Sequence, residues 1–242
     1  MGGKSTLDEQ FWKNYFKVYD VLNYLIPYQE LLDELCRILN PQQEEIILDA
    51  GVGTGNLAIL IEKRRAKVIG LDFSKEALEI YKNKNPNAMV ILHNLEDPLP
   101  FSDNYFDKIV SNNTIYNIPR EKRLEVFKEL YRVLKPGKLI VVANIHKNFK
   151  PIKIYIDGIK KSYENIGILK TINILIKVLI PTLKIFYYNR IIQKVHKFNK
   201  ENLFEIEEQK ELLEKVGFIN ISETKFIYSG QAILNYAFKP SK

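Results

Sequence analysis

The chain has 242 residues, a formal net charge of +7 and an apolar fraction of 46%, which fits one large packed domain or a domain with an insertion. Its single cysteine, Cys36, excludes a disulfide framework and a thiolate metal cluster. The histidines, His93, His146 and His196, lack ligand spacing, so we expect no metal. No apolar signal segment stands at the N-terminus, so a cytoplasmic location is expected.

Residues 8–39 are predicted to form two helices. Apolar and aromatic side chains recur at helical spacing from Phe11 to Leu22. Pro27 interrupts this pattern, and residues 28–39 resume it. The N-terminal helices therefore occupy about residues 1–40, ahead of the first strand.

The next stretch, E-I-I-L-D-A-G-V-G-T-G-N, predicts a strand, a tight turn and the start of a helix. An apolar run ends at Asp49, Gly51, Gly53 and Gly55 follow on alternate positions, and the apolar period then becomes helical. Glycine is needed where the backbone takes positive φ or lies directly against a ligand. The free N–H groups of a helix start favour an electron-rich partner.

Asn56 stands where a dinucleotide-binding loop, G-x-G-x-x-G, would place its third glycine. The pattern G-x-G-x-G, with an acidic residue two positions earlier, instead resembles motif I of the class I S-adenosylmethionine (SAM)-dependent methyltransferases. The similarity is to the group that methylates small molecules and lipids. It implies that SAM is the cofactor and that Asp49 and the three glycines contact it. The alternative is an ordinary turn between a strand and a helix.

Residues 66–71 are predicted as a second strand, which ends at Asp72. In a SAM site, an acid at this position can accept hydrogen bonds from both ribose hydroxyls, and such charge-assisted bonds are strong. Phe73 is placed to pack on the adenine. Ser74 can cap the following helix, which would leave Asp72 free for the ligand.

Residues 89–92 are predicted as the third strand. The segment after it, H-N-L-E-D-P-L-P-F-S-D-N-Y-F-D, resembles the acidic loop of the same family. The resemblance implies that Asn94 and Leu95 lie beside the adenine. Asn94 replaces the usual aspartate, and its amide oxygen can still accept a hydrogen bond from the adenine amino group. A fourth strand, 108–111, then brings Ser111 and Asn112 to the predicted cofactor site.

The remaining pattern completes an α/β fold. The helix at 120–134 leads into L-K-P-G-K, another hallmark of the family, and a Pro-Gly turn precedes the fifth strand. Strands alternating with helices predict a doubly wound parallel sheet. The resemblance implies the mostly parallel seven-stranded sheet of the family, with the last strand antiparallel, in one domain spanning 1–242. The resemblance covers about residues 45–145. The later predicted elements are the strand 139–143, the helix 207–216 and the strands 218–228 and 231–239.

Residues 147–203 form an insertion after strand five that is too long for a structureless loop. Residues 147–201 contain twelve Lys or Arg and three Asp or Glu, so most of the positive charge lies here. The pattern predicts an amphipathic helix over 168–186 with Lys170, Lys177 and Lys184 on the polar face, and Pro181 is expected to kink or end it. The predicted apolar face consists of residues 168, 172, 175, 176, 179, 183 and 186.

Three roles for the insertion compete. It is a helical lid whose apolar face is buried against the core, or such a lid that also contacts a membrane surface through residues 165–190. The third role, nucleic-acid binding through its lysines, is disfavoured because the apolar face is richer than phosphate contacts require. The charges exclude a transmembrane span.

The sequence therefore predicts a SAM-dependent methyltransferase whose acceptor is an apolar small molecule or a lipid-like molecule held under the insertion. The alternatives are a SAM-binding partner subunit without catalysis, and an RNA or protein methyltransferase. The last is disfavoured because S-N-N-T, at 111–114, stands where the Asn-Pro-Pro-Tyr motif of amino-group methylation would be.

The sequence does not identify a catalytic base, because a base is needed only if the acceptor must lose a proton. Tyr15, Tyr19, Tyr116 and His146 are candidates by position, and packing is the alternative role for each. Tyr19 and Asp20 also resemble an aromatic-acidic pair that closes over SAM in many small-molecule methyltransferases, so Tyr19 is a predicted cofactor contact as well. The acceptor atom and the oligomeric state are not indicated.

Overall fold

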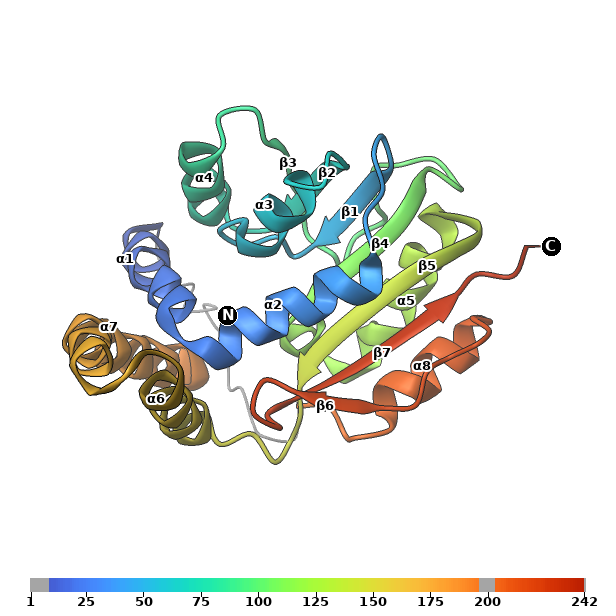
Figure 1. Cartoon of the computed structure of the whole chain (residues 1–242). Coiled ribbons are helices and arrows are strands. Elements are labelled where there is room, and N and C mark those ends of the chain that lie inside the picture. The colour runs from blue at the N-terminus through green and yellow to red at the C-terminus, as the bar shows by residue number, and fades with distance from the viewer. Residues whose placement is uncertain (1–8, 196–202, 242) are drawn as a thin grey trace.

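The computed structural model of the chain describes residues 9–195 and 203–241, and in them seven strands form one sheet (Figure 1). The strand order is β3-β2-β1-β4-β5-β7-β6, with β7 antiparallel to both of its neighbours and the other pairings parallel. The predicted sheet, including its reversed last strand, is confirmed. The strands are β1 (Ile46–Ala50), β2 (Lys67–Asp72), β3 (Met89–Leu92), β4 (Phe106–Asn112), β5 (Leu134–Ile145), β6 (Lys225–Ile227) and β7 (Ala232–Phe238).

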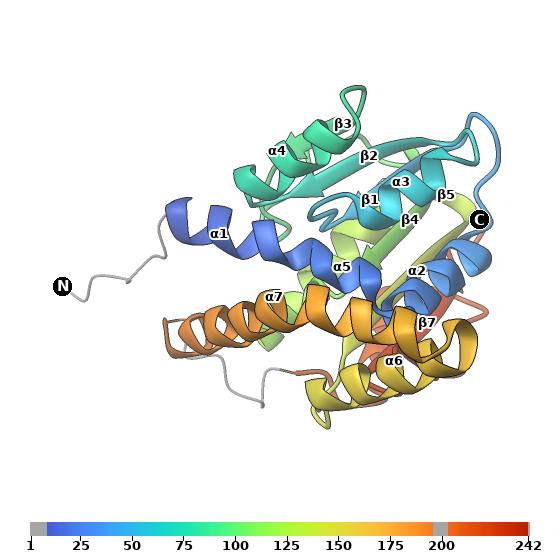
Figure 2. The same ribbon diagram turned by 60° about the vertical axis from the view of Figure 1, so that its left-hand side comes forward.

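Helices cover both faces of the sheet (Figures 1 and 2). Those packed on it are α2 (Ile26–Leu39), α3 (Asn56–Glu62), α4 (Lys75–Lys84), α5 (Arg120–Val133) and α8 (Glu208–Val216). Successive strand residues point to opposite faces. Ile47 and Val141 accordingly share a core with α2, α3 and α4, whereas their sequence neighbours Leu48 and Ile140 share a second core with α5 and α8. The apolar runs of β1 and β5 thus serve two cores, as in other sheets buried on both faces.

Two strands, β5 and β6, differ most from the prediction. β5 already begins at Leu134, because this residue pairs with Phe106 before the chain turns at Gly137, whose φ is +72°. The L-K-P-G-K segment therefore lies within β5. β6 is much shorter than the predicted strand at 218–228. The first part of that stretch meets β7 through a bridge between Ile219 and Phe238 and through hydrogen bonds between Ser222 and Tyr236.

The N-terminal segment consists of α1 (Glu9–Tyr19), a 3-10 helix η1 (Asp20–Tyr24) and α2. Pro27 lies in the first turn of α2, where a missing N–H group costs no hydrogen bond. It therefore begins the second helix. The two predicted helices are present in the described residues, with the short 3-10 helix between them.

The insertion forms a helical hairpin of α6 (Pro151–Ile166) and α7 (Ile168–Val195), joined at Gly167. α7 runs beside α1 and α6 (Figure 2), and its Val178 and Ile185 pack on Val21 of η1. Pro181 lies inside α7, so the prediction that it could end this helix is wrong. No helix in the described ranges is long and apolar enough to span a bilayer.

The predicted buried face of α7 is the wrong one. Ile176 is 69% exposed, whereas Val178 is 4% exposed. α7 carries apolar side chains around much of its circumference, so helical periodicity alone could not identify the side that α1 and η1 cover. The residues of the predicted apolar face that lie exposed are Ile168, Ile172, Ile176, Leu179 and Leu183.

Candidate functional site

Asp49, the loop glycines and Asp72, which were predicted to bind the cofactor, lie at the carboxyl ends of β1 and β2, beside β4. The strand order runs outward in opposite directions from β1 and β4, so the crevice between these two strands is a topological switch point. Ligands of doubly wound sheets bind at such crevices. The glycine loop, residues 51–55, leaves β1 at this crevice and enters α3.

The glycine loop is held against the end of β2. The N–H groups of Gly51 and Val52 both donate to the Leu71 carbonyl, at 2.8 and 3.0 Å. The Gly53 N–H donates to Asp72 Oδ2 at 2.9 Å. Asp72 thus faces the loop, as a shared ligand site requires.

Two of the loop glycines differ in their surroundings. A Cβ on Gly51 would lie 2.1 Å from Thr114 Oγ1, on the segment after β4. At Gly53, where φ is +53°, nothing lies within 4 Å of a Cβ position. Gly51 therefore serves the packing of the loop, and Gly53 leaves open space beside Asp72. Gly55, with φ of +79°, caps the start of α3 and lies against the ring of Tyr81 from α4.

Asp72 is buried but is not free, which corrects one expectation. Ser74 caps α4 as predicted, because its hydroxyl accepts from the Ala77 N–H. Asp72 Oδ1 nevertheless accepts from the Ser74 N–H at 2.9 Å. Burial raises the pKa of Asp72, and the backbone donors oppose that rise. Each carboxylate oxygen has further lone-pair capacity, so a ligand diol can still bind.

Three buried acceptor atoms near the crevice lack a hydrogen-bond partner: Asp49 Oδ2, Asn112 Oδ1 and Asn113 Oδ1. Burial, followed by the charges of Asp72 and Glu62, raises the pKa of Asp49 to about 8. Unsatisfied buried acceptors cost free energy, so such groups in a native protein need an explanation. A cationic ligand with N–H donors would satisfy them.

The 3-10 helix η1 closes the other side of the glycine loop. Asp20 Oδ1 accepts from the Thr54 hydroxyl at 2.7 Å and from Asn56 Nδ2 at 3.1 Å. Lys84 Nζ lies 2.5 Å from the other Asp20 oxygen. Asp20 therefore contacts the loop, and Tyr19 precedes it at the end of α1; the contact of Tyr19 with the cofactor stays a prediction.

Tyrosines from several elements converge beyond η1. Burial raises the pKa of both Tyr15 and Tyr19, and nearby phenols, including that of Tyr116, add to the shift. Tyr28 and Tyr228 pack edge to face with ring centroids 6.0 Å apart. The raised pKa values keep these phenols protonated at neutral pH, so they can donate hydrogen bonds to an acceptor molecule but are not ready bases. Burial also raises the pKa of Tyr155 on α6, whose phenol neighbours that of Tyr15.

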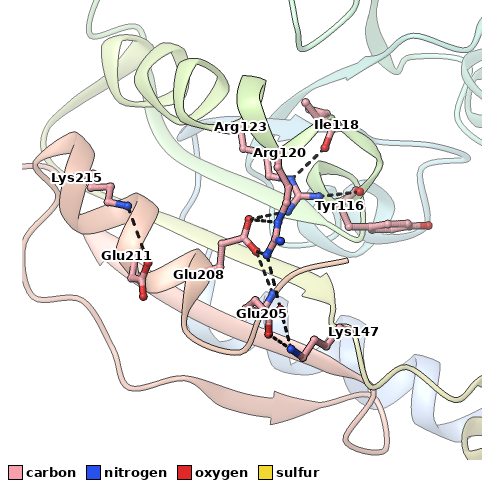
Figure 3. Close-up of polar contacts among 9 residues, drawn as sticks. All are labelled: Tyr116, Ile118, Arg120, Arg123, Lys147, Glu205, Glu208, Glu211 and Lys215. Carbon is pink, nitrogen blue, oxygen red and sulfur yellow. Dashed lines mark hydrogen bonds and ion pairs between the residues drawn. The ribbon is translucent and has the colours of Figure 1, made fainter. Parts of the chain in front are cut away.

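Tyr116 is held in place by a buried cation (Figure 3). The guanidinium of Arg123 donates to the carbonyls of Tyr116 and Ile118 at 3.2 and 3.1 Å. It also pairs with Glu208 of α8 at 2.8 Å and lies over the Phe204 ring. The position of Tyr116 therefore depends on contacts between α5 and α8.

Two predicted site residues have structural partners. His146 Nε2 donates to the Gly230 carbonyl at 3.0 Å, and its Nδ1 accepts from the Asn148 N–H at 3.3 Å. Both ring nitrogens are occupied, which favours packing over base catalysis. The Ser111 hydroxyl is fully buried and donates to the Ala50 carbonyl at 2.8 Å, where it ties β4 to β1.

The predicted adenine contacts lie at the rim of the site. Phe73 is 59% exposed and meets Trp12 edge to face, so it stands between α1 and the end of β2. Asn94 Oδ1 accepts from the Glu96 N–H at 3.1 Å, so it already stabilises its own turn. The Leu95 side chain is buried in the core beneath the loop.

Sequence reasoning missed several residues that build the site. Arg123 and Glu208 look like ordinary exposed helix charges, and no local pattern marks them as buried partners. Thr114 follows the S-N-N segment at the end of β4, so its position could have been suspected. Tyr155 and Tyr228 are far from the motifs in sequence, and only the fold brings them beside Tyr15.

The chain is similar to known methyltransferases. A model of the family described as "Methyltransferase domain" matches residues 47–137. A demethylmenaquinone methyltransferase of Oceanobacillus iheyensis is 32% identical over 154 residues, which cover 58% of this chain and 64% of that protein. A demethylmenaquinone methyltransferase of Staphylococcus aureus is 26% identical over 240 residues, covering 94% of this chain and 91% of the relative.

Solved structures show the same fold. A SAM-dependent methyltransferase from Aquifex aeolicus aligns with a TM-score of 0.59 at 17% identity, covering 96% of this chain and 98% of that one. A SAM-dependent methyltransferase from Thermotoga maritima, described as a possible histamine N-methyltransferase, has a TM-score of 0.61 at 21% identity, with 96% and 97% coverage. At these identities, the likeness concerns the fold alone.

Proposed function

We propose, from the premise that the chain belongs to the class I SAM-dependent methyltransferases, that it transfers a methyl group from SAM to an apolar, quinone-like acceptor. The observation that carries this proposal is the crevice at Gly53, where the Cβ position is open, the N–H binds Asp72, and buried acceptors nearby lack partners. The two curated relatives described above are both named demethylmenaquinone methyltransferases, which favours a quinone-like acceptor.

The residues present fit the cofactor. When bound, SAM supplies a methyl group on a positively charged sulfur; the acceptor nucleophile takes the methyl group, and the sulfur leaves as a neutral thioether. Asp72 would hold the ribose hydroxyls, and the backbone of Gly53 would lie against the ligand without an intervening Cβ. Asp49, Asn112 and Asn113 would supply acceptors to the ammonium end of SAM, and a cation there would favour the ionised form of Asp49.

The chain's own contribution to transfer is positioning and exclusion of water. We propose that the acceptor lies among Tyr15, Tyr19, Tyr116 and Tyr155, whose rings suit a flat apolar molecule. Their protonated phenols can donate hydrogen bonds to its oxygen atoms. Because Tyr155 comes from α6, the insertion at 147–203 takes part in closing this space and acts as a lid within the single domain.

The proposal is tested by incubating the chain with SAM and a short-chain demethylmenaquinone, in its oxidised and its reduced form. We expect S-adenosylhomocysteine to form with at least one of them. Asp72→Ala should weaken SAM binding by about 10- to 100-fold in calorimetry, since hydrogen bonds to a charged group are each worth about 1.5–3 kcal/mol. The control is Asp103→Ala, which removes a carboxylate that is 70% exposed.

Two results would contradict the proposal. If Asp72→Ala bound SAM as tightly as the parent chain, the cofactor would not sit at this crevice. If the chain bound SAM but formed no S-adenosylhomocysteine with either quinone form, it would be a different methyltransferase or a SAM-binding subunit without catalysis.

A further inference from the structure

The hairpin of α6 and α7 lies beside α1 (Figures 1 and 2), and both of its helices carry apolar side chains that are exposed to solvent. Five of them, spread along α7, are Leu169, Ile172, Ile176, Leu179 and Leu183, and Leu169 is 80% exposed. Their spacing of three or four residues places them on one stripe of the helix. Monomeric soluble proteins rarely expose large contiguous apolar patches without a binding role.

α6 carries exposed apolar side chains as well. Ile152, Ile156 and Tyr163 are each more than half exposed, and they too recur at helical spacing. The two helices are adjacent, and at the turn between them Ile166 and Ile168 are both exposed. We name the exposed apolar residues of α6 and α7, from Ile152 to Tyr187, the hairpin face.

Positive charge flanks the hairpin face. Residues 151–191 contain seven Lys or Arg and two Asp or Glu, a net charge of +5. Lys170, Lys177 and Lys184 each follow a residue of the stripe by one position, which is about 100° around the helix. Among the described residues, no carboxylate lies within 4 Å of Lys170 or Lys184. These ammonium groups are therefore available to an external anion.

We propose that the hairpin face docks the protein onto the surface of an anionic lipid bilayer. The exposed isoleucines and leucines would enter the acyl boundary, and the flanking lysines would reach the headgroups. A second copy of the chain fits less well, because two such faces would bring like charges together. A nucleic acid would leave the apolar stripe exposed. The inference does not depend on the proposed function, since it concerns binding in the absence of any methyl donor or acceptor.

Vesicle co-sedimentation of the full chain tests the proposal. The probes are vesicles of phosphatidylcholine alone and vesicles that also contain phosphatidylglycerol. We expect binding to the anionic vesicles, weakened by high salt. The variant Leu169→Ser/Ile176→Ser/Leu183→Ser should lower the partition coefficient by about 100-fold or more, because burying each such side chain is worth well over a factor of ten.

A second variant separates charge from apolar contact. Lys170→Gln/Lys177→Gln/Lys184→Gln should reduce binding to anionic vesicles by roughly fivefold per lysine and leave binding to neutral vesicles unchanged. The matched control for the serine variant is Met89→Ser/Ile219→Ser, which alters two exposed apolar residues away from the hairpin and should bind as the parent chain does. All variants should bind SAM equally in calorimetry.

Three outcomes would overturn the proposal. The parent chain could fail to sediment with either vesicle, or the serine variant could bind as the parent does. In lipid-free sedimentation equilibrium, the parent could also form a dimer that the serine variant abolishes, without vesicle binding, which would assign the hairpin face to a second copy. Because the SAM measurement is separate, none of these results is confused with failure of the proposed function.

Discussion

The glycine loop and the α6–α7 hairpin are stabilised by different kinds of interaction. In the loop, hydrogen bonds and close approaches fix the backbone, such as the Gly53 N–H on Asp72 and the Gly51 Cα against Thr114. The hairpin is held to α1 and η1 by aliphatic contacts and by edge-to-face aromatic contacts of Tyr188, while exposed apolar side chains elsewhere on it meet solvent. A single added methyl group should therefore matter more in the loop than the loss of a whole exposed side chain in the hairpin.

Two glycine-to-alanine substitutions in the loop test this contrast most strongly. Gly51→Ala should lower the free energy of unfolding by about 3–4 kcal/mol, because its Cβ would overlap Thr114 and its φ of +89° is strained for alanine. Gly53→Ala should cost only about 1–2 kcal/mol, since its Cβ meets open space and only the positive φ is unfavourable. Thermal and denaturant unfolding measure both.

SAM binding should be affected in a different order from stability in Gly51→Ala and Gly53→Ala. Gly53→Ala places a methyl group where the ligand is expected and should weaken SAM binding by at least about tenfold, equal to 1.4 kcal/mol. If Gly53→Ala bound SAM normally, the open space beside it would not be the cofactor site. If Gly51→Ala were as stable as the parent, the close approach of Thr114 would not constrain the loop.

The next largest expected effect is a pH-dependent change in stability caused by Asp49. Burial raises its pKa in the folded chain to about 8, well above the ordinary value of an aspartate, so ionisation of Asp49 opposes folding at neutral pH. This penalty is absent below about pH 4 and grows until about pH 8. Relative to Asp49→Asn, the parent chain without ligand should therefore lose about 2–4 kcal/mol of stability between pH 5 and pH 8.

Denaturant unfolding at both pH values, with and without SAM, provides the measurement. SAM should remove much of the pH dependence of the parent, since a bound cation compensates the buried carboxylate. Asp49→Asn should bind SAM more weakly than the parent even though it is more stable alone. Parallel stability profiles for the two proteins would show that Asp49 does not titrate in this range.

The smallest expected effects concern the hairpin, where two isoleucines of α7 that differ in exposure form a matched pair. Ile185 is 6% exposed and Ile176 is 69% exposed on the same helix. Ile185→Ala should cost about 2–3 kcal/mol, because it leaves a cavity against Val21. Ile176→Ala should change stability by less than about 0.5 kcal/mol. Equal losses from the two substitutions would restore the predicted burial of Ile176.

The sequence predicted the glycine loop more accurately than it predicted the packing of the α6–α7 hairpin. Asp49, the three loop glycines and Asp72 occupy adjacent elements, and their types are dictated by backbone geometry, so local pattern was enough to bring them together. The capping role of Ser74 was predicted from its place before the helix, the reversed strand β7 was expected from the family resemblance, and both are confirmed. The engagement of Asp72 by the Ser74 N–H was not foreseen, because it depends on the turn that follows β2.

The sequence by itself determined the alternation of strands and helices, the loop chemistry and the helical nature of the insertion, because each is encoded in side-chain periodicity or in glycine placement over a few residues. Only the tertiary structure decided which side of α7 is covered, that Arg123 is buried against Glu208, and that Tyr155 and Tyr228 join Tyr15. These facts depend on contacts between segments distant in the chain. A helix with apolar residues on most sides, or a charge of ordinary appearance, carries no local signal of the partner it will meet.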